Sequence, residues 1–217
     1  MTEIKEFEFL RDDWFFNQMV TFSLAVTGVR AITKPEDLKE SPQGRIKMSL
    51  GGIILQGLVC GSVLRVLPIA RAIEKGRAVD RIEFEEDSFS HGSPTPPTDT
   101  DINGYMTDVA SVCTIAAYQS VEGRIRARWG NAHRGWPLEV QYLRLLRHAV
   151  AHGNKFTIRK SPDGSTGINP KTPPTWRSSN MTSDDEMDGK QLFNEFLMPG
   201  DIPVLLSDIR QVLGKRP

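Results

Sequence analysis

The residues best suited to chemistry lie in one short stretch, Pro137 to Lys155, which reads PLEVQYLRLLRHAVAHGNK. Arg147, His148 and His152 stand close together near its end. A histidine can take up or release a proton near neutral pH, and an arginine offers paired donors to phosphate oxygens. Cleaving RNA without a metal needs a base for the 2′-hydroxyl, an acid for the leaving 5′-oxygen and cations near the phosphorus. These residue types could supply all three.

The same stretch predicts one amphipathic helix of about four turns. Pro137 suits its first position, where a backbone N–H is not needed, and Gly153 suits the left-handed position just after its end. Arg144 adds a further cation to the last turns, where the carbonyl end of a helix favours positive charge. A purely structural role for these cations is therefore the alternative interpretation. The apolar side expected to face a core consists of Leu138, Tyr142, Leu143, Leu145, Leu146, Ala149 and Val150.

The run from Arg147 to Gly153, RHAVAHG, resembles the signature of the HEPN superfamily, small all-helical domains with an arginine and a histidine a few residues apart near a helix end. In that family a polar residue often follows the arginine, and His148 fits. The match extends from Arg144 to Lys155. The resemblance implies an endoribonuclease in which His152 transfers a proton and Arg147 offsets charge in the transition state, leaving a 2′,3′-cyclic phosphate. His148 either supports this reaction or is a structural histidine.

Helical geometry sets a condition on this site. At 100° per residue, Arg147 and His152 are about 140° apart, whereas Arg144, His148 and His152 share one side of the helix. Either the Arg147 side chain reaches round the helix end, or a second copy of the chain supplies part of the site. The resemblance implies the second arrangement, because HEPN ribonucleases typically form homodimers in which both motifs line one cleft.

Residues around the motif are predicted to bind the RNA phosphates. These are Arg144, Asn154, Lys155 and Arg128, the last from a basic group that could equally serve as helix C-terminal cations. An antitoxin or a regulatory protein could also bind. Some HEPN proteins carry a tyrosine two residues after the histidine, which partner nucleotidyltransferases modify; Asn154 stands there in this chain, which puts such pairing in doubt. The alternative function is a non-catalytic HEPN-like protein that binds nucleotide, RNA or a protein partner through the same face.

Composition describes an ordinary globular protein. The chain has 217 residues, of which 39% are hydrophobic, and its 27 Lys and Arg balance its 27 Asp and Glu. Contact with RNA must therefore come from a local basic patch. The two cysteines, Cys60 and Cys113, lack a C-x-x-C partner, so free buried thiols in a reducing cytoplasm are expected, and a single disulfide between helices is the alternative. The N-terminus lacks the basic and apolar run of a signal peptide, which favours a cytoplasmic protein. No zinc spacing joins the histidines, so no metal or cofactor is predicted.

The rest of the chain predicts a mainly all-α single domain over residues 1–217, an antiparallel bundle of about four or five helices. The apolar run Met48 to Leu64 is interpreted as part of a buried helix packed through its glycines, with no membrane span expected. Residues 1–11 are interpreted as a charged lead-in. A mobile loop is expected over about 76–104, with a short extended piece at Arg81 to Phe84, and an irregular or β-hairpin segment over about 156–200 with its turn at Asp188-Gly189. Helices are predicted at about 12–32, 45–66, 107–129, 137–153 and 201–213.

Overall fold

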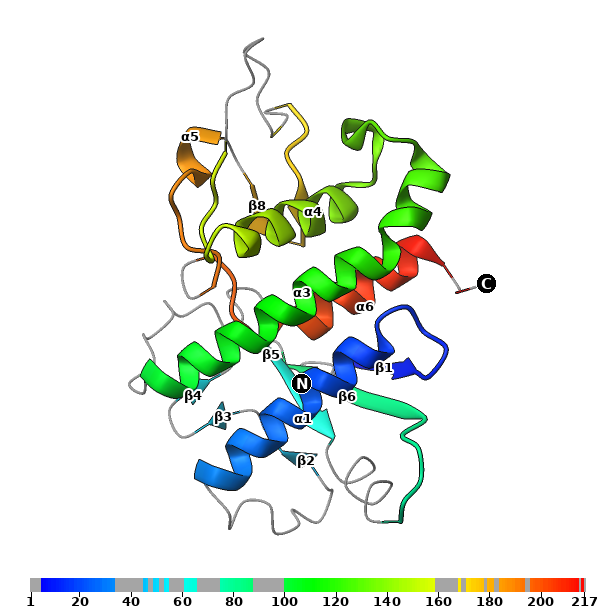
Figure 1. The fold of residues 1–217 in the computed structure, drawn as a ribbon, viewed down its shortest axis with the longest axis vertical. Helices are drawn as coiled ribbons and strands as arrows, with labels where there is room; N and C mark the ends of the chain where they lie inside the picture. Colours follow the sequence, from blue (N-terminus) through cyan, green and yellow to red (C-terminus); the bar gives the residue numbers. More distant parts are fainter. Residues whose placement is uncertain are drawn as a thin grey trace.

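The structure, a computed structural model, describes most of the chain in separate segments. These are residues 5–33, 45–46, 49–50, 53–54, 61–65, 75–87, 100–158, 168, 171–177, 179–181, 184–193, 196–214 and 216. Within them the protein is mainly helical and also contains a four-stranded antiparallel sheet (Figure 1). The long helices are α1 (Phe16–Thr33), α3 (Thr100–Trp129), α4 (Leu138–Ala151) and α6 (Asp201–Leu213).

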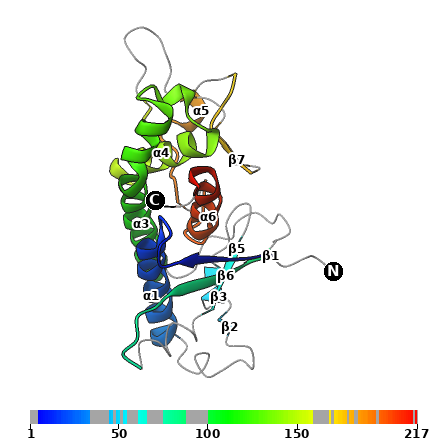
Figure 2. The same cartoon turned by 90° about the vertical axis from the view of Figure 1, so that its right-hand side faces the viewer.

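Helix α3 is the longest helix among the described residues, and the other long helices pack along it. α1 and α4 both run in the opposite direction to α3, α1 beside its first part and α4 beside its second, whereas α6 runs in the same direction (Figure 1). The turned view shows α1 and α3 in one layer, with α6 and the sheet on the same side of it (Figure 2). A short 3₁₀ helix, η2 (His133–Gly135), connects α3 to α4. This connection sets α4 directly against the second half of α3.

The sheet has the strand order β1-β6-β5-β2, with bounds Lys5–Leu10, Arg81–Asp87, Gly61–Arg65 and Arg45–Ile46. Phenylalanines alternate with glutamates in β1, as expected for a strand with one buried face. Phe7 stacks on Phe84 of β6 with ring centroids 5.3 Å apart, and Phe9 meets the same ring edge-on at 6.0 Å. A smaller hairpin pairs β3 (Ser49–Leu50) with β4 (Ile53–Ile54).

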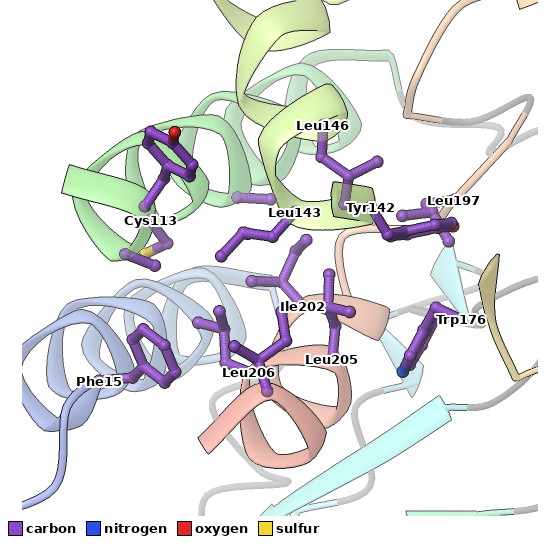
Figure 3. Close-up of a cluster of buried hydrophobic side chains, with 14 of the residues drawn as sticks. Phe15, Cys113, Tyr142, Leu143, Leu146, Trp176, Leu197, Ile202, Leu205 and Leu206 are labelled. Atoms are coloured by element: carbon purple, nitrogen blue, oxygen red, sulfur yellow. The ribbon is translucent and has the colours of Figure 1, made fainter. Parts of the chain in front are cut away.

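Helix α6 lies at the centre of the hydrophobic core. Every residue from Asp201 to Ser207 is buried. Figure 3 shows Ile202, Leu205 and Leu206 of α6 among buried side chains from α4, from α3, from Phe15 just before α1, and from the segments that precede α6. Asp201 fixes the start of the helix by accepting a hydrogen bond from the Met198 backbone N–H at 2.9 Å. This hydrogen bond satisfies a buried carboxylate oxygen and explains why a charged residue is tolerated there.

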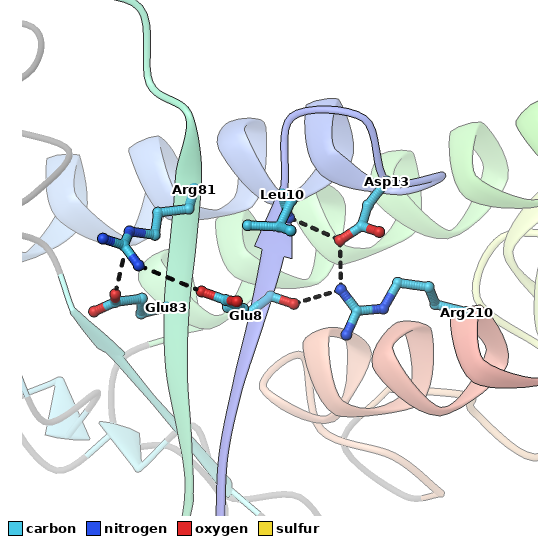
Figure 4. Close-up of polar contacts among 6 residues, drawn as sticks. All are labelled: Glu8, Leu10, Asp13, Arg81, Glu83 and Arg210. Atoms are coloured by element: carbon cyan, nitrogen blue, oxygen red, sulfur yellow. Dashed lines mark hydrogen bonds and ion pairs between the residues drawn. The ribbon is translucent and has the colours of Figure 1, made fainter. Parts of the chain in front are cut away.

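Polar contacts attach α6 to distant parts of the chain. Arg210 donates to the Glu8 carbonyl and to the Asp13 carboxylate, and the Leu10 backbone N–H also donates to Asp13 (Figure 4). Nearby, Arg81 pairs with Glu8 and Glu83 at the surface (Figure 4). The Arg210 contacts hold the connection between β1 and α1 against α6.

On another side of α6, Asp208 accepts from two donors. The Trp176 indole N–H donates to Oδ2 at 2.9 Å, and Arg177 Nε donates to the same oxygen at 2.8 Å. This holds β7 (Thr175–Trp176), which pairs with β8 (Ser179–Asn180), against the helix.

Several predicted helices are confirmed. α4 and α6 match their predicted ranges closely, and α1 begins and ends within a few residues of its prediction. α3 ends at Trp129 as predicted but begins at Thr100, since the fully buried Met106 anchors additional turns before residue 107. Within α3, Val112 faces outward and is 60% exposed. The extended piece at Arg81 to Phe84 is confirmed as part of β6, and residues 88–99 of the expected loop lie outside the described residues.

Other expectations are wrong. The described residues of 45–66 form strands β2 to β5 instead of a helix, because β-branched and apolar residues such as those in Gly61–Arg65 pair with β6. Residues 5–10 form β1 and not a lead-in. The expected bundle is not confirmed, because a sheet takes the place of the second helix. The hairpin at Asp188-Gly189 is replaced by α5 (Asp184–Met187), after which Gly189 turns the chain with φ +80°.

No helix among the described residues combines the length and the hydropathy that a membrane crossing needs.

Candidate functional site

Helix α4 has one polar edge that the rest of the protein covers only in part. Arg144, Arg147 and His148 are half-buried on this edge, and Ala151 and His152 are exposed. We call these five residues the α4 stripe. The opposite sides of the helix are fixed in the core by buried residues from Val140 to Ala149. The predicted catalytic residues therefore all lie on the outward side of one rigidly packed helix.

The end of α4 has the predicted glycine cap, extended by one residue. His152 is the C-cap, and its backbone N–H donates to the carbonyls of Ala149 at 3.1 Å and His148 at 3.2 Å. Gly153 follows with φ +75° and Asn154 with φ +64°. Both values lie in the left-handed region that glycine and asparagine tolerate best. Two such residues in succession turn the chain back, so that the segment after α4 pairs with residues 190–192.

His148 is held by a backbone carbonyl. Its Nε2 lies 3.1 Å from the Thr157 carbonyl oxygen. Since a carbonyl only accepts, the neutral ring carries its hydrogen on Nε2 and leaves Nδ1 as an acceptor. Burial lowers the pKa of His148; the bond to Thr157 opposes this, and the charges of His152, Arg144 and Arg147 lower it further. His148 is therefore a neutral imidazole with a free basic nitrogen at neutral pH.

His152 packs directly on His148. Their ring centroids are 4.4 Å apart with an angle of 63° between the ring planes. His152 is exposed, whereas His148 is half-buried. The predicted pairing of these two histidines on one side of the helix is thus present, with one ring fixed by a hydrogen bond and the other open to solvent. Such a pair can accept and donate protons at one place.

Arg147 lies on the other side of the α4 stripe. Its guanidinium carbon is 5.9 Å from the ring centroid of Tyr118 on α3, in a cation–π contact. Its Nε is buried and has no hydrogen-bond partner among the residues that the structure describes. Among the described contacts none joins Arg147 to His152, in agreement with their expected separation round the helix. Within one chain these two side chains occupy different surroundings.

Arg144 is at the centre of the basic residues around the stripe. Burial lowers its pKa; the phenol of Tyr118 opposes this effect, and Arg147 adds to it. The pKa of His133, in η2, is lowered first by burial and then by the charges of Arg144 and Arg134. The charge of Arg144 also lowers the pKa of His148. The charge of Arg144 therefore acts on groups both in η2 and near the end of α4.

The remaining predicted RNA-contact residues differ in their surroundings. The Asn154 side-chain oxygen accepts from the Phe193 backbone N–H at 3.0 Å, so Asn154 holds the chain reversal after α4. Arg128 donates to the carbonyls of Val212 at 3.2 Å and Leu213 at 3.0 Å, at the C-terminal end of α6. It therefore stabilises the end of another helix. Lys155 is exposed shortly after the end of α4, and its predicted contact with RNA stays a prediction.

The sequence did not reveal the residues that surround the motif from elsewhere in the chain. Tyr118 comes from α3, and the Thr157 carbonyl from the segment after the chain reversal. The spacing of Tyr118, Val121 and Ile125 indicates a buried helix face, but no local pattern shows that this face meets α4. In the part of the chain that the structure describes, no group of three or more His, Cys, Asp or Glu side chains could hold a metal ion.

Comparison of the chain with family models, with curated proteins and with solved structures found no match. The resemblance to the HEPN superfamily therefore rests on the motif and on the helix that carries it.

Proposed function

We propose that this protein is a metal-independent endoribonuclease of the HEPN type that acts as a homodimer. The observation that carries the proposal is the histidine pair, in which His148 is a neutral base fixed by Thr157 and His152 is exposed beside it. Arg144 and Arg147 lie on the same outward side of α4 and supply cations for a phosphodiester. The substrate class is RNA, since the reaction uses the 2′-hydroxyl.

In the proposed reaction His152 exchanges protons with the RNA and His148 supports it. A histidine nitrogen takes the proton of the 2′-hydroxyl, the 2′-oxygen forms a bond to phosphorus, and the bond from phosphorus to the 5′-oxygen breaks. A protonated histidine then donates to the leaving 5′-oxygen. The products are a 2′,3′-cyclic phosphate and a 5′-hydroxyl end, and Arg147 offsets the additional negative charge at phosphorus in the transition state.

A second copy of the chain is part of this proposal, because Arg147 and His152 occupy different sides of the α4 stripe. A two-fold axis near the middle of the stripe would bring Arg147 of one copy towards His152 of the other. Ala151, exposed and small, lies at the middle of the stripe and permits close approach of two helices. Each composite site would then take its arginine and its histidine from different chains.

The experiment is incubation of single-stranded RNA with the protein in excess chelator. Wild-type protein is expected to produce 2′,3′-cyclic phosphate ends, and His152→Ala and Arg147→Ala to lose at least about a hundredfold in rate. Mixing the two inactive variants tests the composite site, since random exchange of subunits gives about a quarter of the wild-type sites intact. No recovery on mixing, despite subunit exchange, contradicts the shared site, and equal cleavage by wild type and His152→Ala contradicts the enzyme.

One observation favours a second candidate function, a non-catalytic protein that binds nucleotide, RNA or a protein partner through the same face. Arg147 packs against Tyr118 while His152 faces solvent, so a single chain does not bring them together. Sedimentation velocity distinguishes the two candidates at an early stage. A protein that stays monomeric at high concentration and still binds RNA supports the binding function.

A further inference from the structure

A second group of side chains, at the contact between α3 and α4, has the composition of an anion site. Arg147 covers the ring of Tyr118, whose side chain comes from α3 and is only 6% exposed as a residue. Burial and then Glu122 raise the pKa of the Tyr118 phenol, and Arg144, Arg126 and Arg147 act against them. The phenol therefore lies within the electrostatic range of three arginines.

The charges at this contact are not balanced. Glu122 is paired with Arg126 at 2.7 Å. In the described part of the chain no carboxylate forms an ion pair with Arg144 or Arg147, although both are half-buried and act on each other. Two neighbouring, partly desolvated cations without a counter-charge are unfavourable. A bound anion would remove this cost.

Hydrogen-bond donors at the same contact also lack acceptors. Arg147 Nε is buried and unpartnered. The Tyr118 hydroxyl makes no hydrogen bond to any described residue and, unlike Arg147 Nε, it is not among the fully buried atoms. Buried N–H groups are almost always paired, so an orphaned guanidinium N–H points to an acceptor that binds there. A phosphate group has several acceptor oxygens and up to two negative charges, and arginine is the residue best suited to bind it.

We propose that Tyr118, Arg144 and Arg147 form a binding site for a phosphate group at the contact between α3 and α4, on the side of the α4 stripe away from His152. The site needs no cleavage activity, so it stands independently of the proposed ribonuclease. In that enzyme it would hold a phosphate of the RNA. Tyr118 acts as a donor from α3, which gives the site a second wall that the motif itself does not supply.

The test is titration of the full-length protein with inorganic phosphate at constant ionic strength. The readouts are the NMR signal of the Arg147 side-chain N–H and the thermal unfolding midpoint. Phosphate is expected to move the Arg147 signal and to raise the midpoint in a saturable manner. Arg144→Gln and Arg147→Gln are expected to weaken binding by about tenfold or more, and Tyr118→Phe, which keeps the ring under Arg147, by severalfold.

Arg11→Gln is the matched control, since Arg11 is an exposed arginine paired with Asp80 at 3.6 Å. It is expected to bind phosphate as wild type does. An effect of phosphate no larger than that of chloride at equal ionic strength overturns the site. Equal loss in Arg11→Gln and Arg144→Gln does so as well, because the binding would then be unspecific.

The source of the phosphate is resolved with short RNA oligonucleotides that carry either a 5′-phosphate or a 5′-hydroxyl. Binding that depends on Arg144 and requires the 5′-phosphate indicates a terminal phosphate, and equal binding of both indicates a backbone phosphate; both outcomes support the site. RNA and phosphate binding that are unaffected by all three substitutions overturn it. His152→Ala separates the two proposals, because it should abolish cleavage and leave phosphate binding unchanged.

Discussion

Asn154 combines two structural roles whose energies can be separated by substitution. Its backbone has φ +64°, and its side-chain oxygen accepts from the Phe193 N–H at 3.0 Å, where Phe193 is fully buried. Asn154→Ala leaves that buried N–H without an acceptor, which costs about 1–3 kcal/mol. It also places a Cβ without a compensating side chain in the left-handed region, which costs about 1 kcal/mol more.

The free energy of unfolding of Asn154→Ala is therefore expected to fall by about 2–4 kcal/mol, which corresponds to roughly 5–10 °C in the unfolding midpoint for a chain of this size. Asn154→Gly keeps the backbone conformation and loses only the acceptor, so its loss should be about 1–3 kcal/mol. Asn154→Asp keeps both features and loses up to about 1 kcal/mol, because a negative charge is unfavourable near the carbonyl end of α4.

The assay is urea unfolding followed by far-UV circular dichroism for all four proteins. The expected order of stability is wild type, Asn154→Asp, Asn154→Gly and then Asn154→Ala. Asn154→Asp as unstable as Asn154→Ala would refute the reasoning, because an acceptor at this position would then have no value. A loss below about 0.5 kcal/mol in Asn154→Ala would do the same, since it would remove both assumed costs.

Three further predictions concern single side chains. Burial lowers the pKa of His148 below its usual 6.5, so the unfolded chain binds the proton more readily and the free energy of unfolding should decrease as the pH falls below about 6.5. In urea unfolding between pH 7 and pH 5, His148→Gln should show a smaller decrease in this free energy than wild type. The same dependence on pH in both proteins contradicts the prediction. Asp208→Asn weakens the bonds from Trp176 and Arg177, and because the Arg177 and Asp208 side chains are each 23% exposed we expect a loss of about 1–2 kcal/mol in urea unfolding. A variant as stable as wild type would show that these bonds do not stabilise the fold. Burial raises the pKa of Cys113 to about 12, so little of the reactive thiolate is present at pH 8. In a Cys60→Ser background, native protein should therefore react with iodoacetamide at pH 8 far more slowly than unfolded protein. Equal rates would show that the thiol is accessible.

Local signals were sufficient for the helices that end in clear caps. Pro137 and Gly153 bracket α4, and Asp201 and Gly214 bracket α6, so both could be placed from neighbouring residues alone. The separation of Arg147 from His152 also follows from helix geometry. The HEPN fold and function stay predictions, since no observation tests them.

The sheet was missed because its signals were short or ambiguous. Residues 6–9, Glu-Phe-Glu-Phe, alternate strictly and indicate a strand, but one strand does not show where its partner lies. Between residues 45 and 66 the apolar run fits a helix or buried strands equally well by pattern. Its glycines, interpreted as sites of close packing, would each cost about 1 kcal/mol in a helix and were evidence against one.

The surroundings of the candidate site could not be predicted because they consist of contacts between residues far apart in the sequence. Tyr118 lies on α3, far along the chain from Arg147, and the bond from His148 to Thr157 depends on the chain reversal at Gly153 and Asn154. Contacts of this kind are set by tertiary packing and not by residue spacing. The sequence therefore indicated which side chains could do chemistry, and the structure indicates which of them have neighbours that shift their pKa.

The central position of α6 has a consequence for biosynthesis. This helix is translated after every segment that it joins, and Arg210 bonds to the Glu8 carbonyl across 202 positions. Until α6 leaves the ribosome, the apolar faces of α3 and α4 that it covers are open to solvent or to chaperones. The nascent chain is therefore expected to become resistant to proteases only after α6 has emerged, and a ribosome stalled ahead of residue 201 should display a protease-sensitive product.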